Sequence, residues 1–216
     1  MTPVTAWLVA LDQPDDIVDV LTDFLPEADR GAARRRVVAR AALRHVLADE
    51  LGTRPGEVDV SRECQRCGHA THGKPWVVGA PELSFSLSHS GRWAIAAVAR
   101  DAVVGADLEV VRARSRLDRL AARVLNDAEL TQYTSTPPPA RLVLFVELWT
   151  AKEAYLKATG RGIDGPLRNV SAPRDGWRLL PLHTDEWVAH VAVDRDAELH
   201  VAEWRPSLSA SAGTGG

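Results

Sequence analysis

The chain has 216 residues, of which 45% are hydrophobic and 25% charged, with a formal net charge of -3. These values are ordinary for a soluble globular protein that buries a core, and the charge is too small to indicate a nucleic-acid or membrane partner. No apolar run approaches the roughly 18 residues needed to span a bilayer, and the first residues lack the basic start and cleavage site of a signal peptide. We therefore expect a cytoplasmic globular protein.

The spacing of apolar residues predicts a mixture of strands and helices. In chain order, we expect a strand at Trp7–Leu11, a long helix at Arg30–Leu51, strands at Ser84–Leu87, Trp93–Ala99 and Val103–Val111, helices at Leu117–Val124, Asp127–Tyr133 and Ala140–Thr159, and strands at Trp177–Leu182, Trp187–Val193 and Leu199–Trp204.

This order does not alternate strictly between strand and helix, which favours an α+β fold over a doubly wound one. Both halves of the chain contain a strand, a long helix and further strands. We expect two pseudo-symmetric lobes, 1–102 and 103–205, each a small, mostly antiparallel sheet packed with a long helix. Small and polar residues over 206–216 predict a disordered tail.

An acidic pair lies in the strand predicted over Val103–Val111. Side chains alternate between the two faces of a strand, so Asp107 and Glu109 point the same way. Two such carboxylates repel each other unless a cation or solvent compensates them, and hard oxygen ligands suit Mg²⁺. An isolated pair of this kind is also typical of a solvated strand face, so the pair alone does not decide its role.

A third carboxylate, Glu153, lies in the middle of an apolar stripe on the helix predicted over Ala140–Thr159. It follows Trp149 by four residues and precedes Leu156 by three. A buried carboxylate is costly unless it is paired, coordinated or protonated. The alternatives are an i,i+4 ion pair with Lys157 and a metal site completed on the strand.

Basic and polar side chains that could hold phosphate occur in three places. The first long helix carries Arg36, Arg40 and Arg44 at intervals of one turn, a row that suits either solvent or a phosphate group. A loop places Lys74 before Pro75. The strand over Ser84–Leu87 is followed by Ser88 and His89, whose hydroxyl and imidazole groups favour an anion site, although a lone histidine is often structural.

Taken together, these residues resemble the Sfp-type 4′-phosphopantetheinyl transferases. The resemblance runs from about Leu25 to Trp204 and rests on GKP at Gly73–Pro75, SHS at Ser88–Ser90, VGADLE at Val104–Glu109 and WTAKEAYLK at Trp149–Lys157. Each motif is weak alone, and the four in this order make a specific signal. The chain departs from the family pattern at Ser86, where Asn is usual, and at Ala106, where Ile or Val is usual.

The resemblance implies an active site between two lobes and transfer of 4′-phosphopantetheine from coenzyme A to a serine of an acyl or peptidyl carrier protein. It implies Mg²⁺ held by Asp107, Glu109 and Glu153. It also implies Glu153 as the base, and Lys157 as the group that neutralises the leaving 3′,5′-ADP. Coenzyme A contacts are expected from Arg36, Arg40, Lys74, Pro75, Ser88, His89 and Lys157.

Other readings of these residues remain open. The same carboxylates would serve a Mg²⁺-dependent phosphohydrolase that acts on coenzyme A or a related phosphate ester, and a non-catalytic module could bind carriers on the same fold. The basic and apolar segment Leu117–Leu130 suits an acidic carrier helix, or is a purely structural helix. A monomer would suffice, because the lobes come from one chain.

The two cysteines, Cys64 and Cys67, are followed closely by His69 and His72. Four such ligands could bind zinc, but the spacing is cramped and there is no second CxxC. Reduced thiols in an irregular loop are the other interpretation.

Overall fold

The computed structural model describes residues 1–23, 25–30, 32–63, 68, 73–160, 167–173 and 176–206. The first half contains β1 (Thr2–Ala10), α1 (Asp15–Asp23), α2 (Glu27–Arg30), α3 (Arg34–Leu51), η1 (Pro55–Glu57), β2 (Val60–Ser61), β3 (Trp76–Val77), β4 (Leu83–Ser90) and β5 (Trp93–Arg100). The second half contains β6 (Val104–Val110), α4 (Leu117–Val124), α5 (Asp127–Ser135), η2 (Pro138–Ala140), α6 (Arg141–Thr159), η3 (Leu167–Asn169), β7 (Arg178–His183), β8 (Trp187–Val193) and β9 (Ala197–Trp204).

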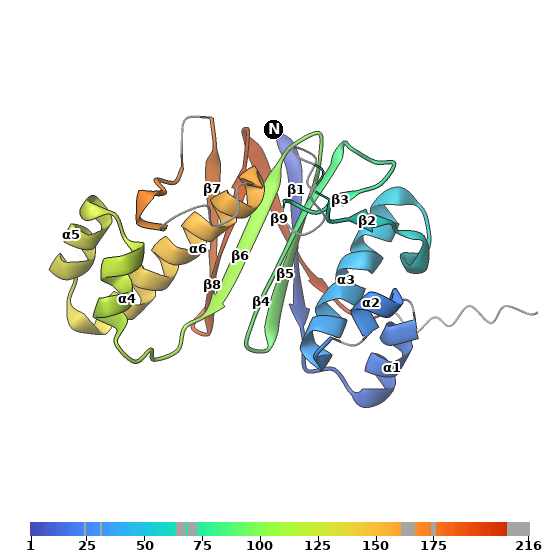
Figure 1. Ribbon diagram of the computed structural model, residues 1–216, viewed down its shortest axis with the longest axis horizontal. Coiled ribbons are helices and arrows are strands. Elements are labelled where there is room, and N and C mark those ends of the chain that lie inside the picture. The colour runs from blue at the N-terminus through green and yellow to red at the C-terminus, as the bar shows by residue number, and fades with distance from the viewer. Residues whose placement is uncertain are drawn as a thin grey trace, which may run out of the picture.

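The fold is α+β, as the sequence predicts, and its strands form two main sheets. One sheet has the order β4-β5-β1-β9 and the other the order β6-β8-β7. Neighbouring strands are antiparallel except for the parallel pair β1 and β9. Figure 1 shows α3 and α6 on opposite flanks of these strands. Among the described residues, no helix has the length and apolar character that crossing a membrane requires.

The last strand departs from the expected division of the chain. We expected residues 103–205 to form one lobe, but β9 pairs with β1 in the first sheet, with Val4 opposite Leu199. The carboxyl-terminal strand therefore returns to the sheet in which the chain began. A parallel partner this far away in the sequence leaves no local pattern, which is why the sequence did not reveal it. The boundary at residue 102 stays a prediction, and residues 207–216, where we expected a disordered tail, lie outside the described residues.

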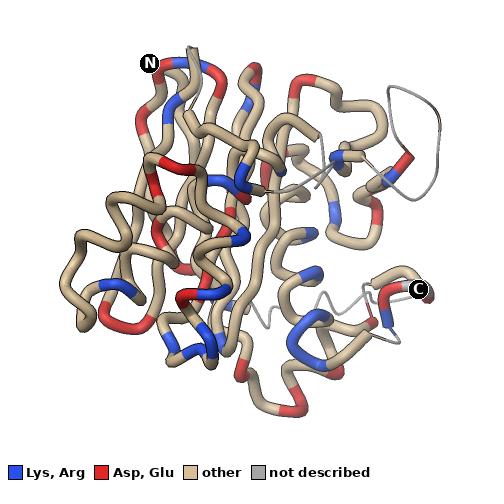
Figure 2. The backbone as a smooth tube through the Cα atoms, turned by 60° about the vertical axis from the view of Figure 1, so that its left-hand side comes forward, with Lys and Arg blue, Asp and Glu red and all other residues tan. Residues whose placement is uncertain are grey.

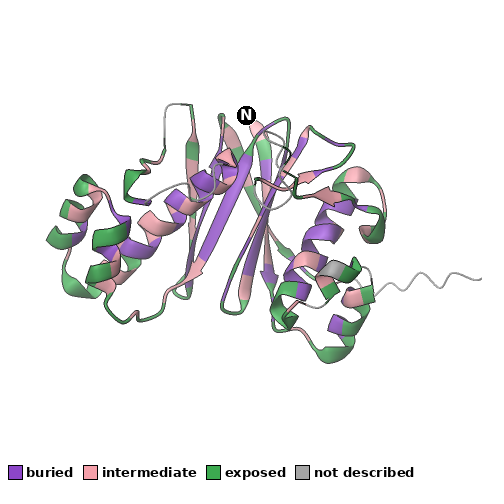
Figure 3. Ribbon diagram, in the orientation of Figure 1, coloured by how far each residue is buried: buried purple, intermediate pink, exposed green. Residues whose placement is uncertain are grey.

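Apolar side chains fill the space between the two sheets. Ile95 and Ala97 of β5 pack with Leu108 of β6 and Val191 of β8, and all four are fully or almost fully buried. Figure 3 shows this burial along the central strands and exposure on the outer faces of α4 and α5. The sheets are thus held together by an apolar core, and the two long helices lie outside it.

Serine side chains join the edge strands of the two sheets. They occupy alternate positions on β4, so they point to one side of the strand. Ser84 Oγ accepts a hydrogen bond from Val104 N at 3.1 Å, and Ser90 Oγ accepts one from Val110 N at 3.2 Å. Ser86, the departure from the family pattern, donates to the carbonyl of Ala106 at 3.5 Å. The hydroxyls connect β4 to β6 and fix which residues of the two strands face each other.

Close packing at Gly105 sets the position of α6 on β6. A Cβ atom at Gly105 would overlap the carbonyl oxygen of Ala154 and the backbone nitrogen of Ala158, and would lie 2.8 Å from Ala158 Cα. A glycine in a strand often marks such an approach of another backbone. Because glycine has no Cβ, α6 can lie close enough to β6 to bring Glu153 and Lys157 near the acidic strand.

The helices differ in detail from the prediction. The expected helix at Arg30–Leu51 is divided, because Ala33 has an extended conformation (φ -55, ψ 141) that precedes the first turn of α3. Helix α1 was not predicted, although its buried Ile17, Val18 and Leu21 follow helical spacing. The stripe expected on α6 is broader than we expected, since Lys152 and Tyr155 are also buried.

Candidate active site

A cavity of about 390 Å³ opens between α3, β4 and α6. Its walls combine apolar side chains such as Leu43, Phe85 and Leu156 with many basic groups and few acidic ones. The basic residues that line it are Arg36, Arg40, Arg44, Arg62, Lys74, His89 and Lys157, and the acidic ones are Asp29 and Glu153. A concave site with apolar walls and convergent charged groups is the usual form of a small-molecule site, and here the excess of positive charge suits an anionic ligand.

A triangle of hydrogen bonds joins Lys157, Asp107 and Ser88 where β4 lies beside β6, a contact that we call the β4–β6 seam. Lys157 Nζ lies 2.6 Å from Asp107 Oδ1 and donates to Ser88 Oγ at 3.0 Å. Ser88 Oγ donates to the same Asp107 Oδ1 at 2.7 Å. The i,i+4 ion pair between Glu153 and Lys157 is not formed, because Lys157 reaches across to the strand instead. Three of the predicted site residues are therefore in direct contact.

Glu109 lies on the same face of β6 and is held by different partners. Ser90 Oγ donates to Glu109 Oε2 at 2.9 Å, and the Arg114 guanidinium lies 3.1 Å from the same oxygen. Arg114 comes from the segment between β6 and α4. Each carboxylate on the strand thus has one serine from β4 and one cation, with Lys157 at Asp107 and Arg114 at Glu109.

Two carboxylate oxygens in this region are buried and have no hydrogen-bond partner. They are Asp107 Oδ2, from the strand, and Glu153 Oε1, from α6. Burial raises the pKa of Glu153, and the neighbouring Asp107 raises it further, while Lys157 opposes the change. Burial likewise raises the pKa of Asp107, against the influence of Lys157. Unpartnered buried acceptors that repel each other are the environment that a divalent cation would relieve.

The donor set of Asp107, Glu109 and Glu153 consists only of carboxylates, which fits a hard cation such as Mg²⁺. Within the described residues, however, no three His, Cys, Asp or Glu side chains are gathered closely enough to hold an ion as they stand. The cations of Lys157 and Arg114 currently neutralise Asp107 and Glu109. The three predicted ligands are therefore neighbours without being a preassembled cage, and the two unpartnered oxygens are where an ion fits best.

The loop before β3 brings Lys74 and Pro75 to the cavity wall. The Lys74 ammonium is tied to the seam, since it donates to Ser84 Oγ at 2.7 Å and to the carbonyl of Val104 at 2.6 Å. Burial lowers the pKa of Lys74 to about 8, while Asp194 opposes the shift. Lys74 thus lines the cavity, and its ammonium is already engaged by two acceptors.

The opposite wall is formed by α3, whose basic positions recur along its length (Figure 2). Arg36 and Arg40 line the cavity, and Arg40 pairs with Asp29 of α2 at 2.7 Å. His89, at the end of β4, lines it too. Burial, followed by the nearby Arg36 and Lys157, lowers the pKa of His89. All the residues predicted to contact coenzyme A therefore lie around one cavity or, in the case of Ser88, beside it.

Arg114 and His190 were not singled out from the sequence, whereas Arg44 belongs to the predicted row of arginines on α3. Arg114 binds Glu109, and Arg44 is buried in the cavity wall, where it donates to the carbonyl of Val58. Beneath α6, His190 stands opposite Asp107 in the β6–β8 pair, and its Nδ1 lies 2.8 Å from Thr150 Oγ1. Only the segment's basic composition could have pointed to Arg114. Cys64, Cys67, His69 and His72, the proposed zinc ligands, lie outside the described residues.

Comparison with known proteins gives a consistent result. The sequence model of a family described as the 4′-phosphopantetheinyl transferase superfamily matches residues 103–202. The 4′-phosphopantetheinyl transferase HetI of Nostoc sp. is 37% identical over 216 aligned residues, covering 88% of this chain and 87% of the relative.

Two relatives from Bacillus subtilis align over much of their lengths as well. The 4′-phosphopantetheinyl transferase Sfp is 30% identical over 174 residues, covering 78% of this chain and 75% of the relative. The relative named 4′-phosphopantetheinyl transferase ffp is 27% identical over 209 residues, covering 93% and 92%. Similarity of this extent, together with the motifs and the cavity, assigns the chain to the same family of enzymes. The chain therefore belongs to the 4′-phosphopantetheinyl transferases.

Proposed function

We propose that this enzyme transfers the 4′-phosphopantetheine group of coenzyme A to a serine of an acyl or peptidyl carrier protein, with Mg²⁺ as the metal. The observation that carries the proposal is the pairing of two features at one place. A cavity lined by basic side chains adjoins two buried carboxylate oxygens, Asp107 Oδ2 and Glu153 Oε1, that lack partners. Such a place suits a polyphosphate ligand that brings a divalent cation with it.

The basic walls of the cavity favour coenzyme A, which carries several phosphate charges. Arg36 and Arg40 on α3 and Lys157 on α6 line opposite sides of the cavity. Guanidinium groups bind phosphate through paired N–H donors, so the α3 wall is suited to the 3′-phosphate and Lys157 to the pyrophosphate. The apolar side chains of Leu43 and Phe85 offer surfaces for the adenine.

The carboxylates Asp107, Glu109 and Glu153 would hold the Mg²⁺. When bound, the ion would neutralise charge on the pyrophosphate and make its phosphorus more electrophilic. The arrangement of the chain supports this role, because burial raises the pKa of both Glu153 and Asp107, Asp107 and Glu109 raise that of Glu153 further, and two carboxylate oxygens are free to accept a ligand.

The chain's own side chains then account for the movement of charge during transfer. The carrier serine hydroxyl attacks the phosphorus that bears the pantetheine arm, a new P–O bond forms, and the bond to the 3′,5′-ADP breaks. Glu153, directly or through water, accepts the serine proton. Lys157 donates to the oxygens of the leaving group as negative charge develops there.

The test is an incubation of the protein with coenzyme A, Mg²⁺ and a panel of apo carrier domains, read by intact-mass spectrometry. We expect a carrier to gain the mass of one phosphopantetheine group, a serine-to-alanine version of that carrier to gain none, and chelation of the metal to stop the gain. Hydrolysis of coenzyme A in the absence of any carrier would instead indicate that the protein is a phosphohydrolase. No gain across several carriers would overturn the proposal.

Arg40 allows a sharper test of the ligand's orientation. If its guanidinium holds the 3′-phosphate, Arg40→Gln should raise KM for coenzyme A about tenfold, the effect of losing about 1.4 kcal/mol of binding. The same substitution should leave KM for 3′-dephospho-coenzyme A almost unchanged. Steady-state kinetics with both donors measures this difference. Equal losses with both donors would place the 3′-phosphate elsewhere.

The segment between β6 and α5 is the proposed docking surface for the carrier. Arg112, Arg116, Arg119 and Arg123 are exposed there, and none forms an ion pair within the described part of the chain. Exposed, unpaired arginines beside the acidic strand suit an acidic carrier helix. The outer face of α4, exposed in Figure 3, is the expected contact.

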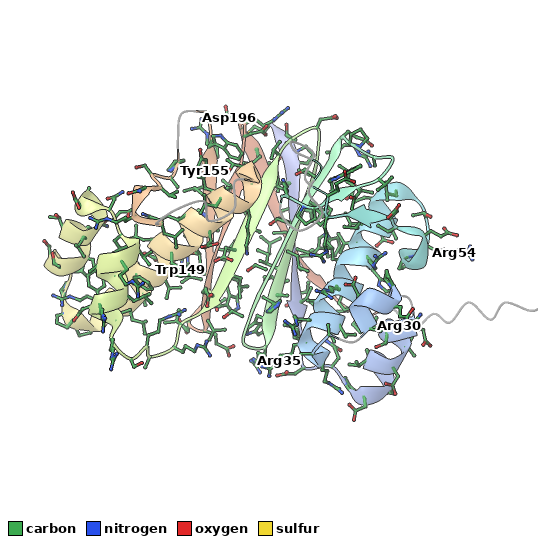
Figure 4. The ribbon with its side chains drawn as sticks, viewed as in Figure 1. Arg30, Arg35, Arg54, Trp149, Tyr155 and Asp196 are labelled. Carbon is green, nitrogen blue, oxygen red and sulfur yellow. The ribbon has the colours of Figure 1, made fainter. Side chains whose placement is uncertain are left out.

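Reversing one of these charges should weaken carrier binding without affecting the donor. We expect Arg119→Glu to raise KM for the carrier about tenfold, with a smaller effect at high salt, and to leave KM for coenzyme A unchanged. Arg54→Glu is the control, because Arg54 is also exposed but lies on the opposite flank of the molecule (Figure 4). Equal effects of the two substitutions on the carrier KM would rule out this surface.

A further inference from the structure

Lys152 is a buried charged side chain for which the proposed chemistry has no use. It precedes Glu153 on α6 and is 1% exposed. Taking an ammonium group out of water is expensive unless acceptors surround it. Its environment must therefore compensate the charge, and the identity of those partners indicates what the residue does.

The ammonium has three partners, from three different elements. Nζ lies 2.6 Å from Glu129 Oε2 of α5. It donates to the carbonyl of Val124 at 3.2 Å and to that of Leu167 at 3.1 Å. An ammonium has three donors, so the set of acceptors is complete.

Two of these partners lie at the ends of helices. Val124 is the last residue of α4, where carbonyl groups lack partners within the helix and attract positive charge. Glu129 is part of the capping box that begins α5, since its carboxylate accepts from Asn126 N at 2.8 Å and its own N–H donates to Asn126 Oδ1 at 2.9 Å. Lys152 thus fixes the junction between α4 and α5 to a single point on α6.

Apolar contacts also hold α4 and α5 on α6, through Ala121, Leu125, Tyr133 and Phe145. Apolar contacts are not directional, so they resist separation of the helices more than they resist sliding. A buried ion pair usually adds little net stability compared with an apolar pair, but it specifies one arrangement. Lys152 and its three partners are therefore better suited to fixing the position of α4 and α5 on α6 than to stabilising the fold.

We propose that Lys152 is a positioning residue that aligns the carrier-docking surface on α4 with Glu153. This inference rests on the proposed function. Lys152 binds α4 and α5, and Glu153, the next residue along α6, is the proposed base. Loss of the lysine would keep both groups intact but would shift them relative to each other. A carrier whose serine reaches Glu153 would then lose part of its contact with the α4 surface and bind more weakly in the productive position.

The test uses Lys152→Met, which keeps the length of the side chain and removes its charge. With the carrier that the wild-type enzyme modifies best, KM for the carrier should rise about tenfold. KM for coenzyme A and kcat at saturating carrier should change by less than about twofold. Hydrogen exchange should become faster in α4 and α5 but not in α3. The control is Arg168→Met, which breaks an exposed ion pair to Asp127 between η3 and α5 and should change none of these values.

A double variant, Lys152→Met with Glu129→Gln, separates positioning from stability. Removing the carboxylate charge that the single variant leaves unpaired should recover part of the lost thermal stability, while the amide oxygen can still accept from Asn126 N. If Lys152 positions the docking surface, KM for the carrier stays raised in the double variant. Recovery of both stability and carrier KM would overturn the inference, as would parallel rises of both KM values in the single variant. A wild-type enzyme that modifies no carrier would overturn the proposed function, and this inference with it.

Discussion

Glu153→Gln should lower kcat for phosphopantetheine transfer by about 10²–10⁴-fold, the usual contribution of a general base. The amide keeps the size of the side chain but cannot accept the serine proton as a carboxylate does. Coenzyme A binding, measured by calorimetry with Mg²⁺, should change far less, because most of the charge that attracts the donor comes from α3 and Lys157.

Glu147→Gln provides the matched control for that experiment. Glu147 lies on the same helix and is half-buried, and its carboxylate forms no ion pair or hydrogen bond with any described residue. The Glu147→Gln enzyme should transfer phosphopantetheine at the wild-type rate. Full activity in Glu153→Gln would remove Glu153 from the chemistry, and equal losses in both variants would point to damage of the helix as a whole.

Gly105→Ala should damage the enzyme through packing, although it adds only one methyl group. The new Cβ would overlap backbone atoms of Ala154 and Ala158, which cannot rotate away as a side chain could. Helix α6 must move off β6, at a cost of about 1–3 kcal/mol or more. Both the melting temperature and the transfer activity should fall, because α6 carries Glu153 and Lys157.

Gly79→Ala distinguishes that steric effect from the general cost of replacing a glycine. Gly79 has a φ of 83, and a Cβ there would meet no atom within 4 Å. The alanine should therefore cost about 1 kcal/mol of backbone strain and leave the transfer rate intact. If Gly105→Ala were as active as Gly79→Ala, the close contact between α6 and β6 would not set the position of the catalytic groups.

Local patterns in the sequence predicted most elements of the fold. Strands β4, β5, β6 and β8 and helices α4, α5 and α6 lie within a few residues of their expected positions. The parallel pairing of β9 with β1 was missed, because it joins the two ends of the described chain. Helix α1 was missed although its apolar spacing was present, since acidic residues dominate its sequence.

The candidate site could be predicted in its residues but not in its contacts. Glu153 stood out because a carboxylate in an apolar stripe needs compensation. One of the alternatives was an ion pair of Lys157 with Glu153, one helical turn away, whereas the structure pairs Lys157 with Asp107. That choice depends on how α6 lies on β6, and on the serine seam that aligns β4 with β6. Lys152 shows the same limit, because its partners come from separate segments whose proximity no local pattern records.

The position of the metal is the point on which the proposed chemistry depends. Titration of the enzyme with Mn²⁺ in the presence of coenzyme A, followed by electron paramagnetic resonance of the free ion, measures it directly. We expect the wild-type enzyme to bind one ion per active site, and Asp107→Asn to bind it at least about tenfold more weakly. Wild-type affinity for Mn²⁺ in both Asp107→Asn and Glu153→Gln would contradict a cation held at these two carboxylates.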